Sequence, residues 1–392
     1  MKGVVVLGST GSIGVSTLNV LERHPERYKV VGLAARRSAA DLTEQAARHP
    51  AARTVLTEPL GSIQGVQDGA PGHAALRELC VHPEADIVVN AIVGAAGLEP
   101  TLLALEAGKR LALANKESLV AGGQLVLEAA RRGGGDLVPI DSEHSAILQC
   151  LRGHAPEEVR RIVLTASGGP FRGWDTHRIA EAGPTDALRH PTWSMGDKIS
   201  IDSATLANKA LEVIEAHFLY DIPYDRIDVV VHPQSIIHSF VEFRDGSVLA
   251  QLGFPTMELP ILIALSYPER VEDAELVTFD PIESSPLTFE AVDRSRFPLF
   301  DLGIRAGRTG GAAPAVYNAA NEVAVQGFLK ERITFPEMAD VVGETLVRVG
   351  SPVLATLEDV LESDAEARRV AGDLVNGLSS AGSRNQAEST ST

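Results

Sequence analysis

The sequence predicts a multidomain α/β protein with an N-terminal Rossmann-like parallel sheet, a central α+β domain and a small C-terminal helical bundle. The chain has 392 residues, which is enough for two or three packed units. Residues 1–150 alternate short β-branched runs with helical stretches, as βαβ units do. Apolar residues at helical spacing return near the C-terminus. Hydrophobic residues make up 44% of the chain, which is ordinary for a globular protein.

The predicted N-terminal domain covers residues 1–150. Short runs rich in valine, leucine and isoleucine indicate buried parallel strands. These runs lie at residues 4–7, 30–34, 86–92, 110–114 and 137–140. Right-handed crossovers between them produce a doubly wound sheet, and ligands of such sheets bind at the carboxyl ends of the strands.

The predicted central domain covers residues 151–266 and carries more widely spaced strands, with one long helix at about 203–219. Its strands are expected at 161–166, 227–231, 237–243 and 247–252. Asp245-Gly246 between the last two predicts a hairpin turn. A Gly- and Pro-rich loop at about 187–197 contains Trp193 and Met195, which are unusual in an exposed loop, and is interpreted as a lid.

Prolines predict an extended linker at 267–297, because they break both helices and strands. A C-terminal helical domain is expected at 298–372, with helices at 313–330 and 335–349. Residues 373–392 contain few side chains to bury and are expected to be a disordered tail.

Composition excludes several classes of function. The formal charge of -17 disfavours nucleic-acid and membrane-surface partners. The two cysteines, Cys80 and Cys150, match no disulfide or metal pattern and indicate a reducing compartment. The start of the chain shows no signal-peptide pattern, and the longest apolar run is far shorter than the ~20 residues of a membrane span. We therefore expect a cytoplasmic protein.

A nucleotide site is predicted where the first strand ends. The segment Gly8-Ser9-Thr10-Gly11-Ser12-Ile13-Gly14 follows this strand and opens a helix, so that its backbone N–H groups are placed to receive a pyrophosphate. The second strand ends in Ala35-Arg36-Arg37-Ser38, where an NAD enzyme usually has an acidic residue. Two arginines there favour the 2'-phosphate of NADP, although a solvated basic turn has the same composition.

Two acidic groups suggest a metal site. Asp141 and Glu143 lie two residues apart at the end of a predicted strand, and the period of two points both carboxylates to one side. Oxygen ligands suit Mg2+ or Mn2+, although paired carboxylates are also common on surfaces. Asn208, Lys209 and Glu212 share one helical turn, where they hold either a phosphate and a metal or an ordinary surface ion pair.

Longer motifs resemble one family. The segment 190–212, HPTWSMGDKISIDSATLANKALE, is similar to the signature of deoxyxylulose phosphate reductoisomerases. Further segments match that family in order, at residues 8–14, 114–118, 141–144, 167–170, 232–238 and 318–322. The resemblance covers residues 1 to about 370 and implies that the central domain is catalytic and dimerises through its sheet into a homodimer.

The resemblance also implies the role of each site residue. Metal ligands would be Asp141, Glu143 and Glu212. The substrate phosphate would be held by Ser167, Ser203, Asn208 and Lys209, and the sugar by Lys116 and Ser142, with Glu143, His190 and Glu212 also contacting substrate. Catalytic roles fall to Lys116, Glu143 and His190. The lid would include His190, Trp193 and Met195, and the cofactor would also contact Asn115, Glu117, Gly196 and Met257.

The implied reaction uses NADPH and one divalent cation (Mn2+, Mg2+ or Co2+) to isomerise and reduce 1-deoxy-D-xylulose 5-phosphate to 2-C-methyl-D-erythritol 4-phosphate, in non-mevalonate isoprenoid precursor biosynthesis. The route expected is retro-aldol cleavage and aldol re-formation before hydride transfer, with a concerted 1,2-shift left open. Two rival functions remain. One is an aldehyde or semialdehyde dehydrogenase, which needs a reactive cysteine, and the other is a catalytically idle NADP-binding sensor.

Overall fold

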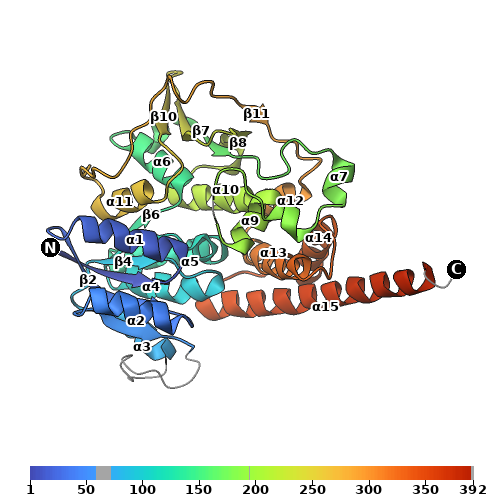
Figure 1. The fold of residues 1–392 in the computed structure, drawn as a ribbon, viewed down its shortest axis with the longest axis horizontal. Helices are drawn as coiled ribbons and strands as arrows, with labels where there is room; N and C mark the ends of the chain where they lie inside the picture. Colours follow the sequence, from blue (N-terminus) through green and yellow to red (C-terminus); the bar gives the residue numbers. More distant parts are fainter. Residues whose placement is uncertain (59–71, 194, 390–392) are drawn as a thin grey trace. The chain divides into compact units, whose positions relative to one another are not determined.

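The computed structural model describes residues 1–58, 72–193 and 195–389. It divides into two compact units, which Figure 1 colours along the sequence. The first unit consists of Met1–Arg152 and Gln251–Asp280, and the second of Gly153–Ala250 and the chain from Pro281 onward. The predicted boundary near residue 150 therefore coincides with a division of the fold. The predicted boundaries near 266 and 298 do not, because residues 251–280 return to the first unit and the C-terminal helices belong to the second.

The first unit is built on a six-stranded sheet in the order β3-β2-β1-β4-β5-β6, in which the neighbouring strands are parallel. This is the doubly wound order that the sequence predicts. The strands are β1 (Lys2–Leu7), β2 (Tyr28–Ala35), β3 (Arg53–Leu56), β4 (Ile87–Asn90), β5 (Arg110–Leu113) and β6 (Asp136–Pro139). Strand β3 was not predicted, because it has only four residues and its neighbours in the sequence are polar and alanine-rich.

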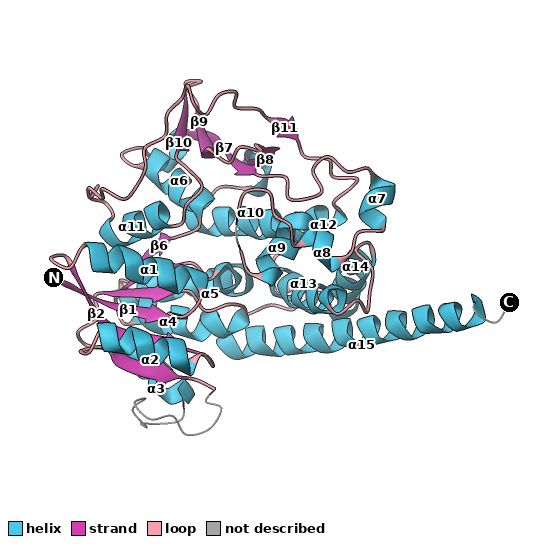
Figure 2. Cartoon of the chain, in the orientation of Figure 1, coloured by secondary structure: helices cyan, strands magenta, loops and turns pink. Residues whose placement is uncertain are grey.

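Helices cover this sheet (Figure 2). They are α1 (Ser12–Arg23), α2 (Ala39–Arg48), α3 (Gly72–Cys80), α4 (Leu98–Glu106), α5 (Lys116–Gly133), α6 (Ser142–Leu151) and α11 (Glu258–Ser266). Ile261 and Leu265 of α11 are fully buried in the same core as Val4 and Leu18. Asp273 beyond α11 accepts hydrogen bonds from Arg23 at 2.9 Å. These contacts explain why 251–280 belongs to the first unit, although it is distant in sequence.

The second unit carries a mixed sheet in the order β10-β9-β7-β8-β11. Its strands are β7 (Val159–Ala166), β8 (Ile227–Val231), β9 (Ile237–Phe243), β10 (Val248–Leu252) and β11 (Glu290–Ala291). Strand β7 is parallel to β8 and antiparallel to β9. The predicted turn at Asp245-Gly246 is present, with Gly246 at φ +90°.

The helices of the second unit include two where one was predicted. They are α7 (Thr176–Ala180), α8 (Pro184–Ala187), α9 (Asp197–Ala204), α10 (Ala207–Tyr220), α12 (Pro298–Thr309), α13 (Ala313–Leu329), α14 (Glu337–Val349) and α15 (Leu357–Ser389). The single helix expected at 203–219 is wrong, because Leu206 adopts a left-handed conformation at φ +58° and separates α9 from α10.

The disordered tail expected at 373–392 is also corrected. Helix α15 continues to Ser389, and residues 390–392 lie outside the described residues. Ala367 and Ala371 are fully buried, and Val375 is 2% exposed. Small side chains at helical spacing on α15 pack closely against α13, and such residues do not stand out in the sequence as a buried face. In the part of the chain that the structure describes, no helix combines the length and hydropathy needed to cross a membrane.

Candidate active site

The glycine-rich turn follows β1 directly and is shaped by two close backbone approaches. Gly8 has φ +79°, and a Cβ atom there would lie 2.5 Å from the carbonyl oxygen of Ala91. A Cβ atom on Gly14 would lie 2.3 Å from the carbonyl oxygen of Gly8. Gly11 is the N-cap of α1 and has no side chain to cap the helix, so its first turn is open to an anion. The turn therefore has the geometry of a pyrophosphate site.

Gln45 supports this turn and was missed by the sequence analysis. Its side-chain amide donates a hydrogen bond to the carbonyl oxygen of Ser9 at 2.8 Å, and the residue is 3% exposed. A glutamine three residues after the buried Leu42, on the apolar face of α2, is the signal that identifies such a support.

The basic turn between β2 and α2 is held by a third side chain. Arg36 donates to one carboxylate oxygen of Glu58 at 2.7 Å, and Arg37 contacts the other at 2.6 Å. Both guanidinium groups lower the pKa of the Glu58 carboxyl. All three side chains are more than a third exposed. Two arginines are thus gathered around one anion at the position where the 2'-phosphate of NADP is expected.

Asn115, Glu117 and Met257 were expected at the cofactor, and all three lie in the first unit. Asn115 is the N-cap of α5 and accepts the Ser118 backbone N–H at 2.9 Å. Its amide donates to the carbonyl oxygen of Gly94 at 3.0 Å and to Glu117 at 3.1 Å. Asn115 therefore fixes the loop after β4 to the loop after β5. Met257 is the N-cap of α11 and packs against the core.

Asp141 and Glu143 lie together, but the strand geometry predicted for them is wrong. Strand β6 ends at Pro139, Asp141 is the N-cap of α6 and Glu143 is in its first turn. The carboxylates share a side because Asp141 accepts the backbone N–H of Glu143, at 3.3 Å. The hydroxyl of Ser142 donates to Glu143. A helix N-terminus stabilises these negative charges.

Lys116 lies beside the two carboxylates. Its Nζ is 3.0 Å from Asp141 Oδ2, with the side chains 11% and 17% exposed. Lys116 begins α5 after β5, and Asp141 precedes α6 after β6. Because β5 and β6 are neighbouring parallel strands, the ends of both strands meet at one edge of the sheet. The first unit thus brings together Lys116, Asp141, Ser142 and Glu143.

In the second unit, α10 carries a buried polar cluster. The amide of Asn208 donates to Glu212 Oε1 at 2.6 Å, and Lys209 forms an ion pair with Glu212. Lys209 is 4% exposed and Glu212 is 1% exposed. A buried charge pair costs desolvation energy, which an exposed surface pair does not. This burial excludes the surface interpretation of the cluster.

Ser167, His190 and Ser203 lie near one another in the same unit. Gly168 and Gly169, at φ +85° and +66°, fold the loop after β7 so that a Cβ on Gly169 would lie 2.6 Å from the carbonyl oxygen of Ser203. Ser167 Oγ is 3.0 Å from His190 Nε2. His190 Nδ1 accepts the backbone N–H of Trp193 at 2.9 Å, which places the neutral ring's proton on Nε2. Burial lowers the pKa of His190 to about 4.

The loop predicted to be a lid, 187–197, begins at the end of α8 and leads into α9. Trp193 and Met195 are half-buried, Gly196 is the N-cap of α9, and Ser194 lies outside the described residues. A separate cavity of about 1380 Å3 in the second unit is lined by α7, α12 and α14 residues such as Ile179, Phe300 and Asp340. None of the residues predicted to bind the substrate lines this cavity, so we do not assign the substrate to it.

Family models match most of the chain. The model described as 1-deoxy-D-xylulose 5-phosphate reductoisomerase matches residues 4–123, that of its C-terminal domain matches 137–220, and that described as DXP reductoisomerase C-terminal domain matches 252–370. Proteins named 1-deoxy-D-xylulose 5-phosphate reductoisomerase from Ralstonia nicotianae and Nocardia farcinica are 51% and 52% identical. The alignments cover 94% and 95% of this chain, and 97% and 94% of those proteins.

Solved structures are similar over nearly the whole chain. The Zymomonas mobilis enzyme in complex with NADPH has a TM-score of 0.88 at 45% identity, covering 95% of this chain and 99% of that one. A DOX-P reductoisomerase in complex with NADPH, fosmidomycin and magnesium has a TM-score of 0.87 at 38% identity, covering 96% and 99%. With the motifs at the sites described above, these matches show that the chain belongs to the 1-deoxy-D-xylulose 5-phosphate reductoisomerase family.

Proposed function

We propose that this protein converts 1-deoxy-D-xylulose 5-phosphate to 2-C-methyl-D-erythritol 4-phosphate, with NADPH as the reductant and one divalent cation, in isoprenoid precursor biosynthesis. It is an NADPH-dependent oxidoreductase. The observation that carries the proposal is the pairing of Lys116 with Asp141 beside Glu143, at the edge of a sheet whose first turn suits a pyrophosphate. The relatives named 1-deoxy-D-xylulose 5-phosphate reductoisomerase, which match over nearly the whole chain, support it.

The acidic residues suit a hard cation. Asp141 and Glu143 of the first unit offer only oxygen atoms, and we assign Glu212 of the second unit as the third ligand. When bound, the cation would supply Lewis-acid polarisation of the substrate's ketone and hydroxyl oxygens, and NADPH would supply the hydride. Mg2+, Mn2+ and Co2+ all accept such ligands, and we propose one of these three as the bound ion.

The remaining residues bind the sugar phosphate and move protons. Ser167, Ser203, Asn208 and Lys209 offer three hydrogen-bonding side chains and one positive charge for the phosphate. His190 Nε2–H, which meets Ser167 Oγ at 3.0 Å, is an additional donor. Lys116 Nζ and the Glu143 carboxylate are assigned to proton transfer, and Ser142 Oγ to a sugar hydroxyl. We retain the retro-aldol and aldol route.

The lid is assigned to exclusion of water. Trp193 lies three residues after His190 and is tied to it by its backbone N–H. A phosphate that engages His190 would therefore also order the tryptophan. Binding energy from the phosphate, which is remote from the reacting carbons, would in this way contribute to closure over the sugar. We further propose a cytoplasmic homodimer, joined through the sheet of the second unit.

The two rival functions are weaker. An acylating aldehyde dehydrogenase needs a thiolate, whereas burial raises the pKa of Cys150 to about 11 and keeps it a thiol at neutral pH. An idle NADP sensor has no use for the Lys116–Asp141 pair. The test is the oxidation of NADPH with 1-deoxy-D-xylulose 5-phosphate, with and without Mn2+. Turnover that needs both substrate and metal supports the proposal, and absence of turnover with metal present favours the sensor.

Glu58→Gln is expected to bind NADPH about threefold more tightly, because the carboxylate competes with the 2'-phosphate for Arg36 and Arg37 and exposed ion pairs are weak. NADH affinity should not change. Fluorescence titration with NADPH and with NADH measures the ratio of the two dissociation constants. Glu44→Gln, which removes an exposed acid of α2, is the matched control. An equal gain for NADH and NADPH would show that these arginines do not contact the 2'-phosphate.

His190 is expected to stay neutral down to about pH 5, because burial disfavours the imidazolium and shifts its pKa downward from the ordinary value near 6.5. The Nε2–H donor is then available throughout the neutral range. Histidine NMR resonances recorded from neutral to acidic pH measure this, with the His190 signal assigned by its loss in His190→Asn. A midpoint near 6.5 contradicts the buried position of the ring.

A further inference from the structure

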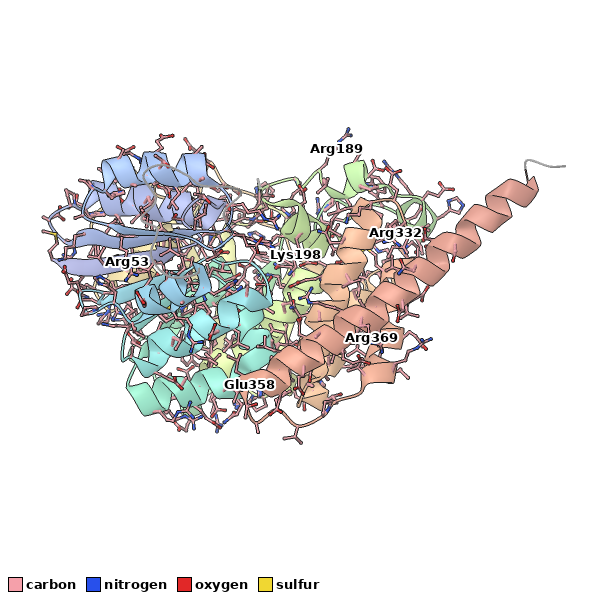
Figure 3. The ribbon with its side chains drawn as sticks, turned by 90° about the horizontal axis from the view of Figure 1, so that it is seen from below. Arg53, Arg189, Lys198, Arg332, Glu358 and Arg369 are labelled. Carbon is pink, nitrogen blue, oxygen red and sulfur yellow. The ribbon has the colours of Figure 1, made fainter. Side chains whose placement is uncertain are left out.

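A buried polar cluster in the second unit lies outside the site described above. Asp202 of α9 is 1% exposed and accepts a hydrogen bond at its Oδ1 from the Asn321 amide, at 2.7 Å. Its Oδ2 is 3.0 Å from Lys198 Nζ, one turn earlier on α9, where Figure 3 labels the lysine. Asn321 is fully buried on α13. The cluster therefore joins α9 to the C-terminal helices.

Stability alone does not account for this cluster. A buried carboxylate loses its hydration, and a buried pair is often no more stable than apolar side chains of the same volume. Asn321 Oδ1, moreover, has no hydrogen-bond partner among the described residues. Buried polar atoms are rarely left unsatisfied. The asparagine is thus held with only its N–H2 end in use, and that end faces Asp202.

Helix α9 connects this cluster to Ser203 and to the predicted lid. The helix has eight residues, begins at the end of the predicted lid and ends two residues before the left-handed Leu206. The turn at Leu206 prevents α9 from continuing directly into α10, so contacts along α9, including the Asp202–Asn321 hydrogen bond, contribute to its orientation. Ser203 directly follows Asp202, and its carbonyl lies against Gly169 of the loop that carries Ser167. A rotation of α9 would move Ser203 and the lid together.

We propose that Asn321, acting through Asp202, is a positioning residue that fixes α9 and thereby the substrate-phosphate pocket and the lid. This proposal rests on the proposed function only where it takes the bound anion to be the phosphate group of the substrate. The C-terminal helices then take part in substrate binding without contacting the substrate. The next residue of α13, Glu322, forms a separate ion pair with Arg368 of α15, at 2.7 Å.

The test uses Asn321→Leu in the full-length protein and inorganic phosphate as the probe. The two tryptophans are Trp193, on the lid, and Trp174, so a Trp174→Phe background makes emission report on the lid. We expect Asn321→Leu to raise the phosphate concentration needed for the Trp193 response about tenfold. The KM for the sugar phosphate should rise by a similar factor, while kcat and NADPH affinity change less than about twofold.

Two further variants separate positioning from folding. Glu322→Gln breaks a neighbouring ion pair of α13 and should lower the melting temperature without changing phosphate affinity. The swap Asp202→Asn with Asn321→Asp restores one hydrogen bond with donor and acceptor exchanged, and should recover most of the phosphate response. If Asn321→Leu does not fold, this swap still tests the hydrogen bond between residues 202 and 321.

Unchanged phosphate affinity in a folded Asn321→Leu protein, or equal losses in Asn321→Leu and Glu322→Gln, would overturn the positioning role. The phosphate response of Trp193 and the melting temperature do not depend on turnover. Failure of the native protein to act on the sugar phosphate would therefore overturn the proposed function and leave the positioning result intact.

Discussion

Glu212→Gln is expected to reduce metal-dependent turnover by about a thousandfold or more, because loss of one charged ligand weakens the cation that polarises the substrate. Glutamine keeps the volume and an oxygen atom but removes the negative charge. It also removes the ion pair between Glu212 and the buried Lys209, which adds to the loss. NADPH oxidation with saturating sugar phosphate and a titration of Mn2+ measures the effect.

The control for this variant separates metal binding from folding. Glu215→Gln removes the other buried carboxylate of α10, which is 3% exposed and is not an assigned ligand. It should keep the Mn2+ affinity of the native protein, measured by electron paramagnetic resonance, whereas Glu212→Gln should lose it. Equal Mn2+ affinity in the native protein and Glu212→Gln would remove Glu212 from the ligand set.

Lys209→Met is expected to raise the KM for the sugar phosphate about a hundredfold, because a buried cation next to a phosphate contributes much more than an exposed one. NADPH affinity should stay within about twofold, since the nucleotide turn lies in the first unit. Steady-state kinetics with each substrate varied in turn gives both values.

Lys330→Met provides the matched control, since it removes an exposed lysine of the same unit. Its KM should equal that of the native protein. A Lys209→Met protein whose kcat falls while KM is unchanged would contradict phosphate binding and point instead to a role in the chemical step.

Much of the fold follows from local patterns. Valine-rich runs identified five of the six strands in the first sheet, and the same approach located β8 and β9 at their observed bounds. Predictions failed where local pattern was weak or misleading. The four residues of β3 are too few to show a period, and the small buried residues of α15 do not show the large apolar side chains of a typical buried face.

For the candidate site, sequence spacing found the residues but not always their geometry. Asp141 and Glu143 share a side through the N-cap of α6 and not through strand pleating, because the chain leaves β6 at Pro139. Likewise, α10 brings Asn208 and Lys209 to Glu212 at the predicted spacing, but the burial of Lys209 and Glu212 is not visible in the sequence. Burial depends on what packs over a face, which periodicity does not specify.

The sequence by itself determined the family, the doubly wound parallel sheet and the glycine-rich turn, and it singled out the candidate acidic and phosphate-binding residues, because each depends on neighbours along the chain. Only the tertiary structure decided that residues 251–280 return to the first unit, that Gln45 bonds to Ser9, that Glu58 pairs with Arg36 and Arg37, and that Asp202 meets Asn321. These contacts join residues far apart in sequence. Their free energy comes from packing and burial in three dimensions, which no local pattern records.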